Sequence, residues 1–492
     1  MSTGKCPLHS SFHKNCTRRG FLRDSVGVVA APIVLAGCSS SVKGPASAQA
    51  PIVARGPGSK YTPRIRVAFV RRKGEYGMWW PGAVYDGQAA RRMYSEHLSR
   101  TAEKLQAQLE LRSEPIYSLA EGQAWIAEAE AAKVDGLFLV MLDRQQHSWP
   151  TARKVSESVL PAVIFSPLGT SFTTNTAGLA GKEGCVVYAT NDLAQATYGL
   201  KMLSAAAKIR RSRCVVIRGN RRQEAPLAEL GITLQYVPAQ TFVDEYNRVG
   251  ETDAILAMAD DYIRRAQAMK NCTRQDVING VRSYYVAGRI LKAEQADAIT
   301  MDCLGALGNI KVSLPCIAWS RMNDDGIPAA CEADLGAVAS HIIVQQLFDR
   351  PGFQQDPVAD TSDDTIIGAH CSCPTRLRGF GTASEPFYLM HHHGMRDAVP
   401  RTLWRIGQRV TSVDVLPGRA NEKTAVLISA GTVVDNMAVP PSGGCVVSVK
   451  VKFDGDQNVL TFPGFHQVFF YGDYKDELVD FCQLMGLEAK VV

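Results

Sequence analysis

The stretch Asp135-Gly136-Leu137-Phe138-Leu139-Val140-Met141-Leu142 is continuously apolar after its first two residues. Two further short apolar runs, Ile65–Val70 and Pro161–Ser166, lie before and after it, and a longer stretch with a polar face, Asp86–Leu109, precedes it. A strand that is apolar along its whole length is covered on both faces, which is typical of parallel sheets packed between helices. The sequence therefore predicts a first doubly wound α/β domain over residues 63–180.

A second series of the same kind predicts another doubly wound parallel-sheet domain over residues 181–325. Its expected elements are a strand at Cys185–Ala189, a helix at Asp192–Arg211, a strand at Cys214–Arg218, two helical stretches between Asp244 and Ala296, and a strand at Ala298–Met301. A helix from about Ala329 to Phe348 is expected to begin the remaining part of the chain.

After that helix, strands dominate the pattern. They are expected at Thr365–Ala369, Ala425–Ser429, Gly444–Phe453 and His466–Tyr471, followed by a helix at Asp473–Met485 and a last strand near Val491. This pattern predicts a β-rich, barrel-like C-terminal domain over residues 326–492.

The first residues have the features of an export signal. Thr17-Arg18-Arg19-Gly20-Phe21-Leu22-Arg23 resembles the twin-arginine signal of bacteria. The apolar run Val26–Gly37 that follows has 12 residues, fewer than the roughly 20 that span a membrane. Leu35-Ala36-Gly37-Cys38 resembles a lipobox, which predicts a leader over residues 1–37, a lipid on Cys38 and a flexible tether over residues 38–62.

The expected product is a membrane-anchored lipoprotein that faces the periplasm or the exterior. The alternative is cleavage within Ala46–Ala50, which would release a soluble protein. Both interpretations place the mature chain outside the cytoplasm. Because the twin-arginine route carries folded proteins, it also suits a domain that folds, and loads any metal, before export.

The composition of the mature chain argues against a nucleic-acid partner. Five basic residues and one acidic residue lie within residues 1–37, so the formal net charge falls from +6 to +2 without the leader. Ten of the 13 cysteines remain after Cys38, and most are expected to be buried thiols that form no disulfide framework. Cys371-Ser372-Cys373 lacks the spaced partners of a zinc site.

Three stretches, taken in order, resemble the L-fucose isomerase and L-arabinose isomerase superfamily. They are Pro328-Ala329-Ala330-Cys331-Glu332-Ala333-Asp334-Leu335-Gly336-Ala337, then Ile366-Ile367-Gly368-Ala369-His370-Cys371, and then Gly464-Phe465-His466-Gln467-Val468 with Gly472-Asp473 and Glu477-Leu478. The resemblance covers roughly residues 64–492 and is strongest after Ala298. It implies two α/β domains and a β-rich domain, in agreement with the pattern above.

The resemblance also implies aldose–ketose isomerisation with a divalent metal, usually Mn²⁺, because the cation binds two adjacent sugar oxygens while a base moves a proton between neighbouring carbons. Asp334 and His466 match metal ligands of the fucose branch, and Glu332 and His370 resemble ligands of the arabinose branch. Asp334 and Glu332 are also the expected catalytic acids. Alternatively, these two acids only favour the N-terminus of a helix, and the histidines belong to the core.

The chain departs from the family at one position. Where the family has a carboxylate that is both ligand and acid/base, this sequence has Ala306. Asp302 is the nearest substitute, but four residues along a continuous strand span about 13 Å, unless a turn at Gly305 shortens the path. Either Asp302 or Glu332 takes over the role, or the chain keeps the fold without the chemistry.

Four other residues are candidates for substrate binding: Arg71, Trp80, Ser171 and His393. Arg71 ends a predicted strand, where α/β folds place ligand groups, although a solvated charge is the simpler interpretation. Trp80 could stack on a sugar or pack on its own domain. Ser171 lies in a polar loop suited to sugar hydroxyls, and His393 ends a run of three histidines that could line a cleft.

The sequence thus leaves two hypotheses. The first is an exported isomerase-like protein that binds a small-molecule sugar and a metal, with a homo-oligomer as a further expectation; whether it is an active enzyme stays open. The second is a non-catalytic sugar-binding lipoprotein, which the Ala306 position favours.

Overall fold

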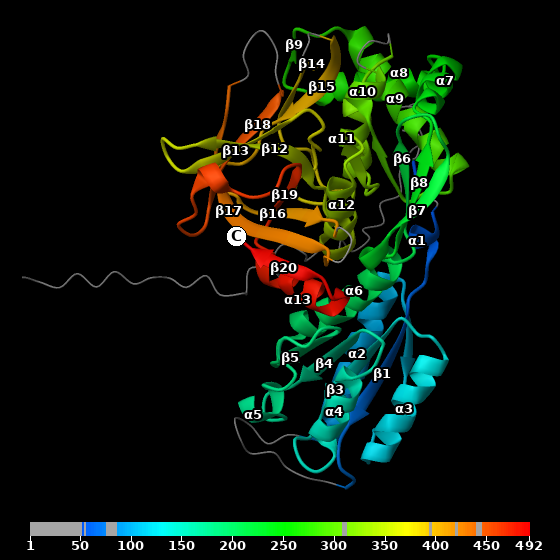
Figure 1. Ribbon diagram of the computed structural model, residues 1–492, viewed down its shortest axis with the longest axis vertical. Helices are drawn as coiled ribbons and strands as arrows, with labels where there is room; N and C mark the ends of the chain where they lie inside the picture. Colours follow the sequence, from blue (N-terminus) through cyan, green and yellow to red (C-terminus); the bar gives the residue numbers. More distant parts are fainter. Residues whose placement is uncertain are drawn as a thin grey trace, which may run out of the picture. The chain divides into compact units, whose positions relative to one another are not determined.

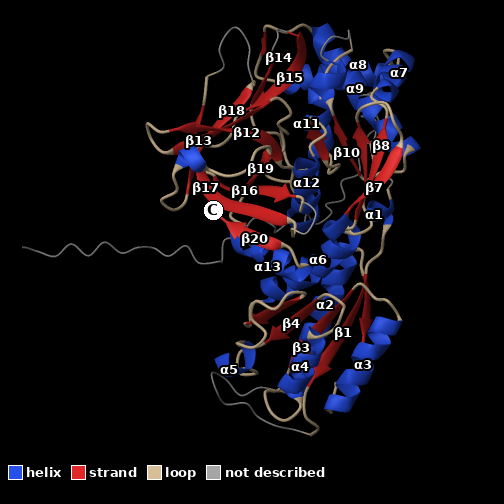
Figure 2. Cartoon of the chain, viewed as in Figure 1, coloured by secondary structure: helices blue, strands red, loops and turns tan. Residues whose placement is uncertain are grey.

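The computed structural model describes residues 52–53, 56–74, 86–307, 312–392, 396–418, 422–438 and 445–492. These residues form two parallel-sheet α/β parts followed by a closed antiparallel β-barrel (Figures 1 and 2). The predicted fold class is therefore confirmed. The leader, with Cys38, lies outside the described residues, and so do Trp80 and His393.

The first sheet, sheet A, has the strand order β2-β1-β3-β4-β5, and all its strands are parallel. Its strands are β1 Arg64–Val70, β2 Gln108–Leu111, β3 Gly136–Met141, β4 Ala162–Ser166 and β5 Cys185–Ala189. Every residue of β3 is buried, because helices cover both faces of the sheet. One face packs against α2 Gly87–Leu105 and α6 Leu193–Ile209, and the other against α3 Leu119–Ala131 and α4 Ser148–Ser156.

The edge strand β5 corrects one prediction. The sequence placed Cys185–Ala189 in the second α/β domain, but β5 pairs in parallel with β4, with Cys185 opposite Ala162. The chain leaves sheet A only after this strand, through α6. The domain bounds 63–180 and 181–325 stay predictions.

The second sheet, sheet B, has the order β11-β10-β6-β8-β7, in which only the edge strand β7 is antiparallel. Its strands are β6 Arg213–Ile217, β7 Gln223–Leu227, β8 Ile232–Val237, β10 Ala298–Met301 and β11 Ala329–Cys331. The fully described stretch 240–293 holds three helices where two were predicted: α7 Gln240–Arg248, α8 Asp253–Arg265 and α9 Arg274–Ala293. Two shorter helices follow, α10 Cys303–Leu307 and α11 Cys316–Asp324.

The predicted helix over residues 329–348 is wrong in its first part. Ala329–Cys331 is strand β11, and α12 runs only over Leu335–Phe348. The two elements are separated by Glu332 and Ala333, which both have positive φ angles, of 63° and 53°. This backbone turn is what ends the strand and starts the helix in a new direction.

The barrel is a ring of strands in the order β16-β19-β12-β13-β18-β17, closed by the pairing of β17 with β16. Its strands are β12 Phe353–Asp360, β13 Thr365–His370, β16 Arg409–Leu416, β17 Ala425–Asn436, β18 Val447–Phe453 and β19 Gln467–Tyr471. β20 Glu488–Val491 adds to β17 in parallel, after helix α13 Lys475–Met485. The sequence did not predict β12 and β16.

Smaller elements complete the described chain. A separate sheet has the order β15-β14-β9, from β9 Met269–Lys270, β14 Phe387–His392 and β15 Arg396–Thr402. The short helices are α1 Pro57–Lys60, α5 Thr173–Thr176, η2 Ala228–Leu230 and η3 Val459–Thr461. None of the described helices has both the length and the apolar character that a membrane crossing needs.

Candidate metal centre

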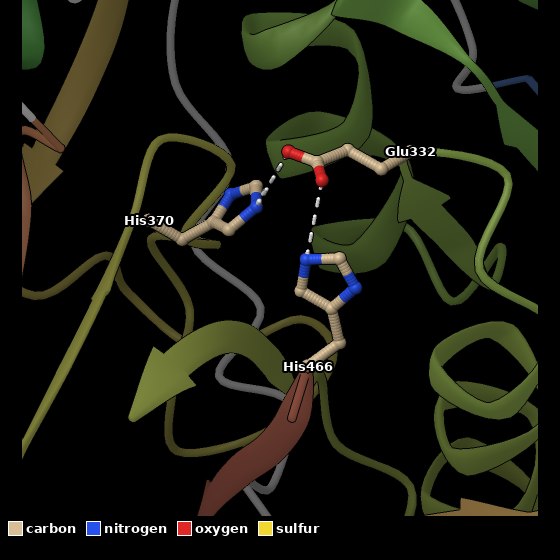
Figure 3. A group of neighbouring side chains, drawn as sticks. All are labelled: Glu332, His370 and His466. Atoms are coloured by element: carbon tan, nitrogen blue, oxygen red, sulfur yellow. Dashed lines mark ion pairs between the residues drawn. The ribbon is translucent and has the colours of Figure 1, made fainter. Parts of the chain in front are cut away.

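Three side chains converge where sheet B meets the barrel (Figure 3). Glu332 directly follows β11, His370 is the last residue of β13, and His466 directly precedes β19. Each offers one ligand atom, and these atoms lie within 4.8 Å of one another. The Oε1 atom of Glu332 is 3.8 Å from Nε2 of His370, and its Oε2 atom is 3.4 Å from Nε2 of His466. The arrangement is a candidate metal-binding triad.

Asp356 on β12 adds a carboxylate that sequence reasoning missed. β12 lies between β13 and β19, with Asp356 opposite Ala369 on one side and Gln355 opposite Gln467 on the other. Because His466 directly precedes Gln467, this register places Asp356 next to His466. Its Oδ1 atom is 3.1 Å from Nε2 of His466.

Asp334 contacts the other nitrogen of the same imidazole. Its Oδ1 atom accepts a hydrogen bond from the backbone N–H of Ala337 at 2.7 Å and so caps helix α12. Its Oδ2 atom is 3.0 Å from Nδ1 of His466. Asp334 therefore fixes the orientation of the His466 ring, and the Nε2 atom points toward Glu332 and Asp356.

The carboxylates control the charge of His466. Burial by itself lowers the pKa of His466, but the neighbouring carboxylates of Asp334, Asp356 and Glu332 outweigh it and raise the pKa to about 11. The ion pair with His466 in turn lowers the pKa of Glu332. Burial opposes the loss of a proton from Asp334, yet its bonds to His466 and to the backbone still lower its pKa. The three carboxylates thus favour a positive charge at this place, either the protonated imidazole of His466 or a metal ion that displaces its proton.

Two buried atoms support a metal at this place. Nε2 of His466 and Oδ1 of Asp356 are both buried, and neither makes a hydrogen bond of acceptable geometry although they are only 3.1 Å apart. Buried polar atoms normally have a hydrogen-bond partner, so each of these requires an explanation. A divalent cation held between a carboxylate oxygen and an imidazole nitrogen would satisfy both. The residues present fit such an ion.

Glu332 reaches the centre from a strained backbone. The left-handed conformation costs about 1–2 kcal/mol in a residue that has a side chain, and both Glu332 and Ala333 adopt it. The backbone N–H of Glu332 is hydrogen-bonded to the thiol of Cys303. Because such strain concentrates at functional sites, this turn is consistent with a role for Glu332 beyond folding.

Asp302 and Ala306 do not lie on one extended strand. β10 ends at Met301, and Cys303–Leu307 is the short helix α10, so the chain turns between Asp302 and Ala306, as in the alternative with a turn at Gly305. The Oδ1 atom of Asp302 accepts a hydrogen bond from the N–H of Gly305 at 3.2 Å. Its carboxylate is engaged with α10, while Ala306 packs against the core of sheet B and the barrel.

Arg71 and Ser171 follow strands of sheet A, and no described contact joins them to the triad. Arg71 is buried, and its Nη2 atom donates to the carbonyl of Gly74 at 2.8 Å. The hydroxyl of Ser171 accepts from that of Ser166 at 3.0 Å. The structure therefore brings together Glu332, Asp334, His370 and His466 of the sequence candidates, and leaves Arg71 and Ser171 elsewhere.

No protein-family model matches the chain. The chain is 26% identical over 280 residues to the sulfoquinovose isomerase of Clostridium sp. (strain MSTE9). The matched region covers 54% of this chain and 59% of that protein, so the chain spans about three-fifths of its relative's length. A sugar isomerase is thus among the relatives of this chain, while membership of the fucose and arabinose isomerase superfamily stays a prediction.

Proposed function

We propose that the protein is a metal-dependent isomerase that interconverts the aldose and ketose forms of a monosaccharide or a sulfonated derivative. The observation that carries the proposal is the convergence of Glu332, Asp356 and His466, with His370 beside them, on one partly exposed centre. The side chains of Glu332 and Asp356 are 34% and 32% exposed, so a sugar can reach them. The similarity to a sulfoquinovose isomerase supports both the reaction and the substrate class.

A divalent cation such as Mn²⁺, when bound, would stabilise the negative charge that develops on two adjacent sugar oxygens. Glu332, Asp356 and His466 would hold it, and His370 completes the donor set. Asp334 acts through His466, because a carboxylate on the second ring nitrogen fixes the tautomer of a ligating histidine. We therefore assign Asp334 a positioning role, in place of the ligand role that the sequence suggested.

The proton transfer falls to the carboxylates. Aldose–ketose conversion removes a proton from one carbon and returns it to the neighbouring carbon through an ene-diol, which requires an ionised acid close to both carbons. The lowered pKa of Glu332 keeps this side chain in the base form. Glu332 and Asp356 approach His466 from two different elements, so they can contact neighbouring atoms of one sugar.

Asp356 also bears on the non-catalytic alternative. That alternative was favoured because Ala306 stands where the family has an acid. The carboxylate of Asp356, on β12, lies at the centre, which supports catalysis by a protein that has an alanine on α10.

The proposal is tested with purified protein that is stripped of metal by a chelator and reloaded with Mn²⁺. Isomerisation of sulfoquinovose and of neutral aldoses is followed by NMR. We expect turnover that depends on the metal and falls at least about 100-fold in Glu332→Gln and in Asp356→Asn. Asp360→Asn, at the far end of the same strand β12, serves as the control and should retain activity. A metal-loaded protein that converts none of these sugars would contradict the proposal.

We also propose that the protein works outside the cytoplasm as a lipoprotein anchored through Cys38. The order of the Arg18-Arg19 pair, the apolar run and the lipobox supports this location.

A further inference from the structure

Three neighbouring strands of sheet B are followed by charged residues that stand in one row. Arg218, Asp302 and Glu332 directly follow β6, β10 and β11, and these strands are adjacent in the order β11-β10-β6. The register pairs the last residues of the three strands with one another, so the residues that follow them stand at the same level. Glu332 of the candidate metal centre is one end of this row, and Arg218 is the other.

The row crosses the point at which the strand order of sheet B reverses. From β6 the chain continues to β7 and β8 on one side, and it later places β10 and β11 on the other side. In open α/β sheets, ligands bind outside the carboxyl ends of the strands at such a point. A ligand of the metal centre is therefore expected to extend along the row toward Arg218.

The side chain of Arg218 is available to such a ligand. Its backbone N–H donates to the carbonyl of Val237 at 3.1 Å, which fixes the backbone in the sheet, while the residue is exposed. Within the part of the chain that the structure describes, Arg218 forms no ion pair with a carboxylate. The neighbouring acid, Asp302, accepts a hydrogen bond from the N–H of Gly305 at 3.2 Å instead.

The length of the row suits an open-chain sugar. Neighbouring strands are about 4.8 Å apart, so the backbones of β6 and β11 are separated by roughly 10 Å. The carbon–carbon bonds of a six-carbon chain, about 1.5 Å each, place its two ends roughly 6 Å apart. The side chains of Glu332 and Arg218 cover the remaining distance, so one sugar can contact both.

We propose that Arg218 binds an anionic group, a sulfonate or a phosphate, on the last carbon of a sugar whose carbonyl end lies at the metal centre. A guanidinium donates two parallel hydrogen bonds to such an oxyanion, and its planar fork makes the contact specific. Glu332, Asp334 and Asp356 make the other end of the row acidic, so the anion is held more favourably at Arg218. The inference rests on the proposed function, because it places the sugar at that centre.

The experiment separates binding from turnover. Sulfoquinovose, glucose 6-phosphate and glucose are reduced to their alditols, which are open chains without a carbonyl group and cannot be isomerised. Each alditol is titrated calorimetrically into the purified full chain with Mn²⁺ in the buffer. We expect at least one anionic alditol to bind about 10–100-fold more tightly than glucitol, because hydrogen bonds to charged groups are the strong ones. The alditol that binds more tightly identifies the group as sulfonate or phosphate.

Three variants assign the preference to Arg218. Arg218→Ala should remove it and leave the affinity for glucitol within about twofold, and kcat/KM for the anionic aldose should fall by the same factor as the affinity. Arg218→Lys keeps the charge without the planar fork and should retain part of the preference. Arg222→Ala is the control of equal charge in the same loop, because Nη1 of Arg222 is 2.9 Å from Glu294 and its charge is already paired.

Three results would overturn the inference. The first is the same affinity for anionic and neutral alditols, undetectable binding of all three included. The second is a preference that survives in Arg218→Ala, and the third is an equal loss in Arg222→Ala, which would assign the effect to the charge of the loop. A protein that isomerises none of the aldoses defeats the proposed function, while the titrations still decide the role of Arg218.

Discussion

His466 presents its two ring nitrogens to different groups. Nδ1 lies 3.0 Å from Asp334, and Nε2 lies 3.1 Å from Asp356 and 3.4 Å from Glu332. A neutral imidazole can bind a metal through only one nitrogen while the other donates its proton. Asp334 thereby selects which nitrogen remains available. All three acids thus contact one histidine, and we propose that they differ in function.

Two variants separate the roles of Asp334. Asp334→Asn keeps an N-cap of similar quality, but it weakens the charge that orients His466, so we expect Mn²⁺ affinity to fall about 10–100-fold with little loss of stability. Asp334→Ala loses the cap as well and should cost about 0.5–2 kcal/mol of unfolding free energy. Calorimetric metal titration and chemical denaturation measure the two effects. Unchanged affinity in both variants would contradict the positioning role.

The sequence named most of the residues at the centre but not their roles. Glu332, His370 and His466 stand in stretches that resemble a family, so they could be chosen without a structure. Asp356 could not be chosen from the sequence alone. Pro357 interrupts the pattern of its strand, and a proline argues against the interior of a strand. Asp334 was taken for a ligand because the sequence does not show that its two oxygens reach Ala337 and Nδ1 of His466.

Helix α12 connects the centre to the barrel. A Cβ atom added at Gly336 would lie 2.2 Å from the backbone carbonyl oxygen of Val415 on β16, so only glycine allows this approach. One turn further, the hydroxyl of Ser340 accepts a hydrogen bond from the N–H of Val415 at 3.0 Å. The first turn of α12, which begins after Asp334, is therefore held against the barrel.

Gly336→Ala should push α12 away from β16. Overpacking of this kind costs about 1–3 kcal/mol, and the shift should also weaken Mn²⁺ binding through Asp334. Gly178→Ala is the matched control, because a Cβ atom there meets nothing within 4 Å. We expect the control to stay within about 0.5 kcal/mol of the wild type in chemical denaturation. Equal stability of the two variants would show that the contact is unimportant.

His341 in the middle of α12 makes stability depend on pH. Burial lowers the pKa of His341 to about 3, and neither of its ring nitrogens has a hydrogen-bond partner among the described residues. Below pH about 6.5 the unfolded chain takes up a proton there and the folded chain does not, so the unfolding free energy falls as the pH falls from about 6.5 to 3. One such group contributes up to about 1.4 kcal/mol per pH unit.

His341→Leu should remove this contribution. We therefore expect the metal-free variant to lose less stability than the wild type between pH 6.5 and about 4, as measured by denaturation at a series of pH values. Parallel curves for the two proteins would mean that His341 does not titrate on unfolding.

The sequence predicted buried elements better than turns. β1, β3, β4, β6 and β10 were found because continuous apolar runs have few alternative interpretations. The boundary between β11 and α12 was missed because Glu332 and Ala333 adopt a left-handed conformation that usually indicates glycine. The turn residues thus gave no local signal for the break.

Along the described chain, three structural parts follow one another. Sheet A and sheet B are parallel sheets of the α/β type, and the barrel closes through β16 and β17. The composition and the alternation of elements predicted this order. The sequence could not show that β5 belongs to sheet A and not to the second α/β part, because an apolar strand before a helix fits the edge of either sheet.

The leader predicts where the molecule resides. Changing both arginines, Arg18→Lys and Arg19→Lys, should retain the protein in the cytoplasm, because the twin-arginine route requires the pair. Cys38→Ser should block lipidation, and the protein should leave the membrane fraction. Cell fractionation with an antibody measures both effects. Normal membrane recovery of the double-lysine variant would contradict the predicted route.

The position of β19 in the barrel also sets the time at which a metal can enter. β19 lies between β12 and β16, and His466 directly precedes it, so the last donor is synthesised long after Glu332, Asp356 and His370. A growing chain cannot close the centre until its final strands have left the ribosome. If the folded protein is exported as we propose, the cation is chosen from the cytoplasmic supply and then carried outside.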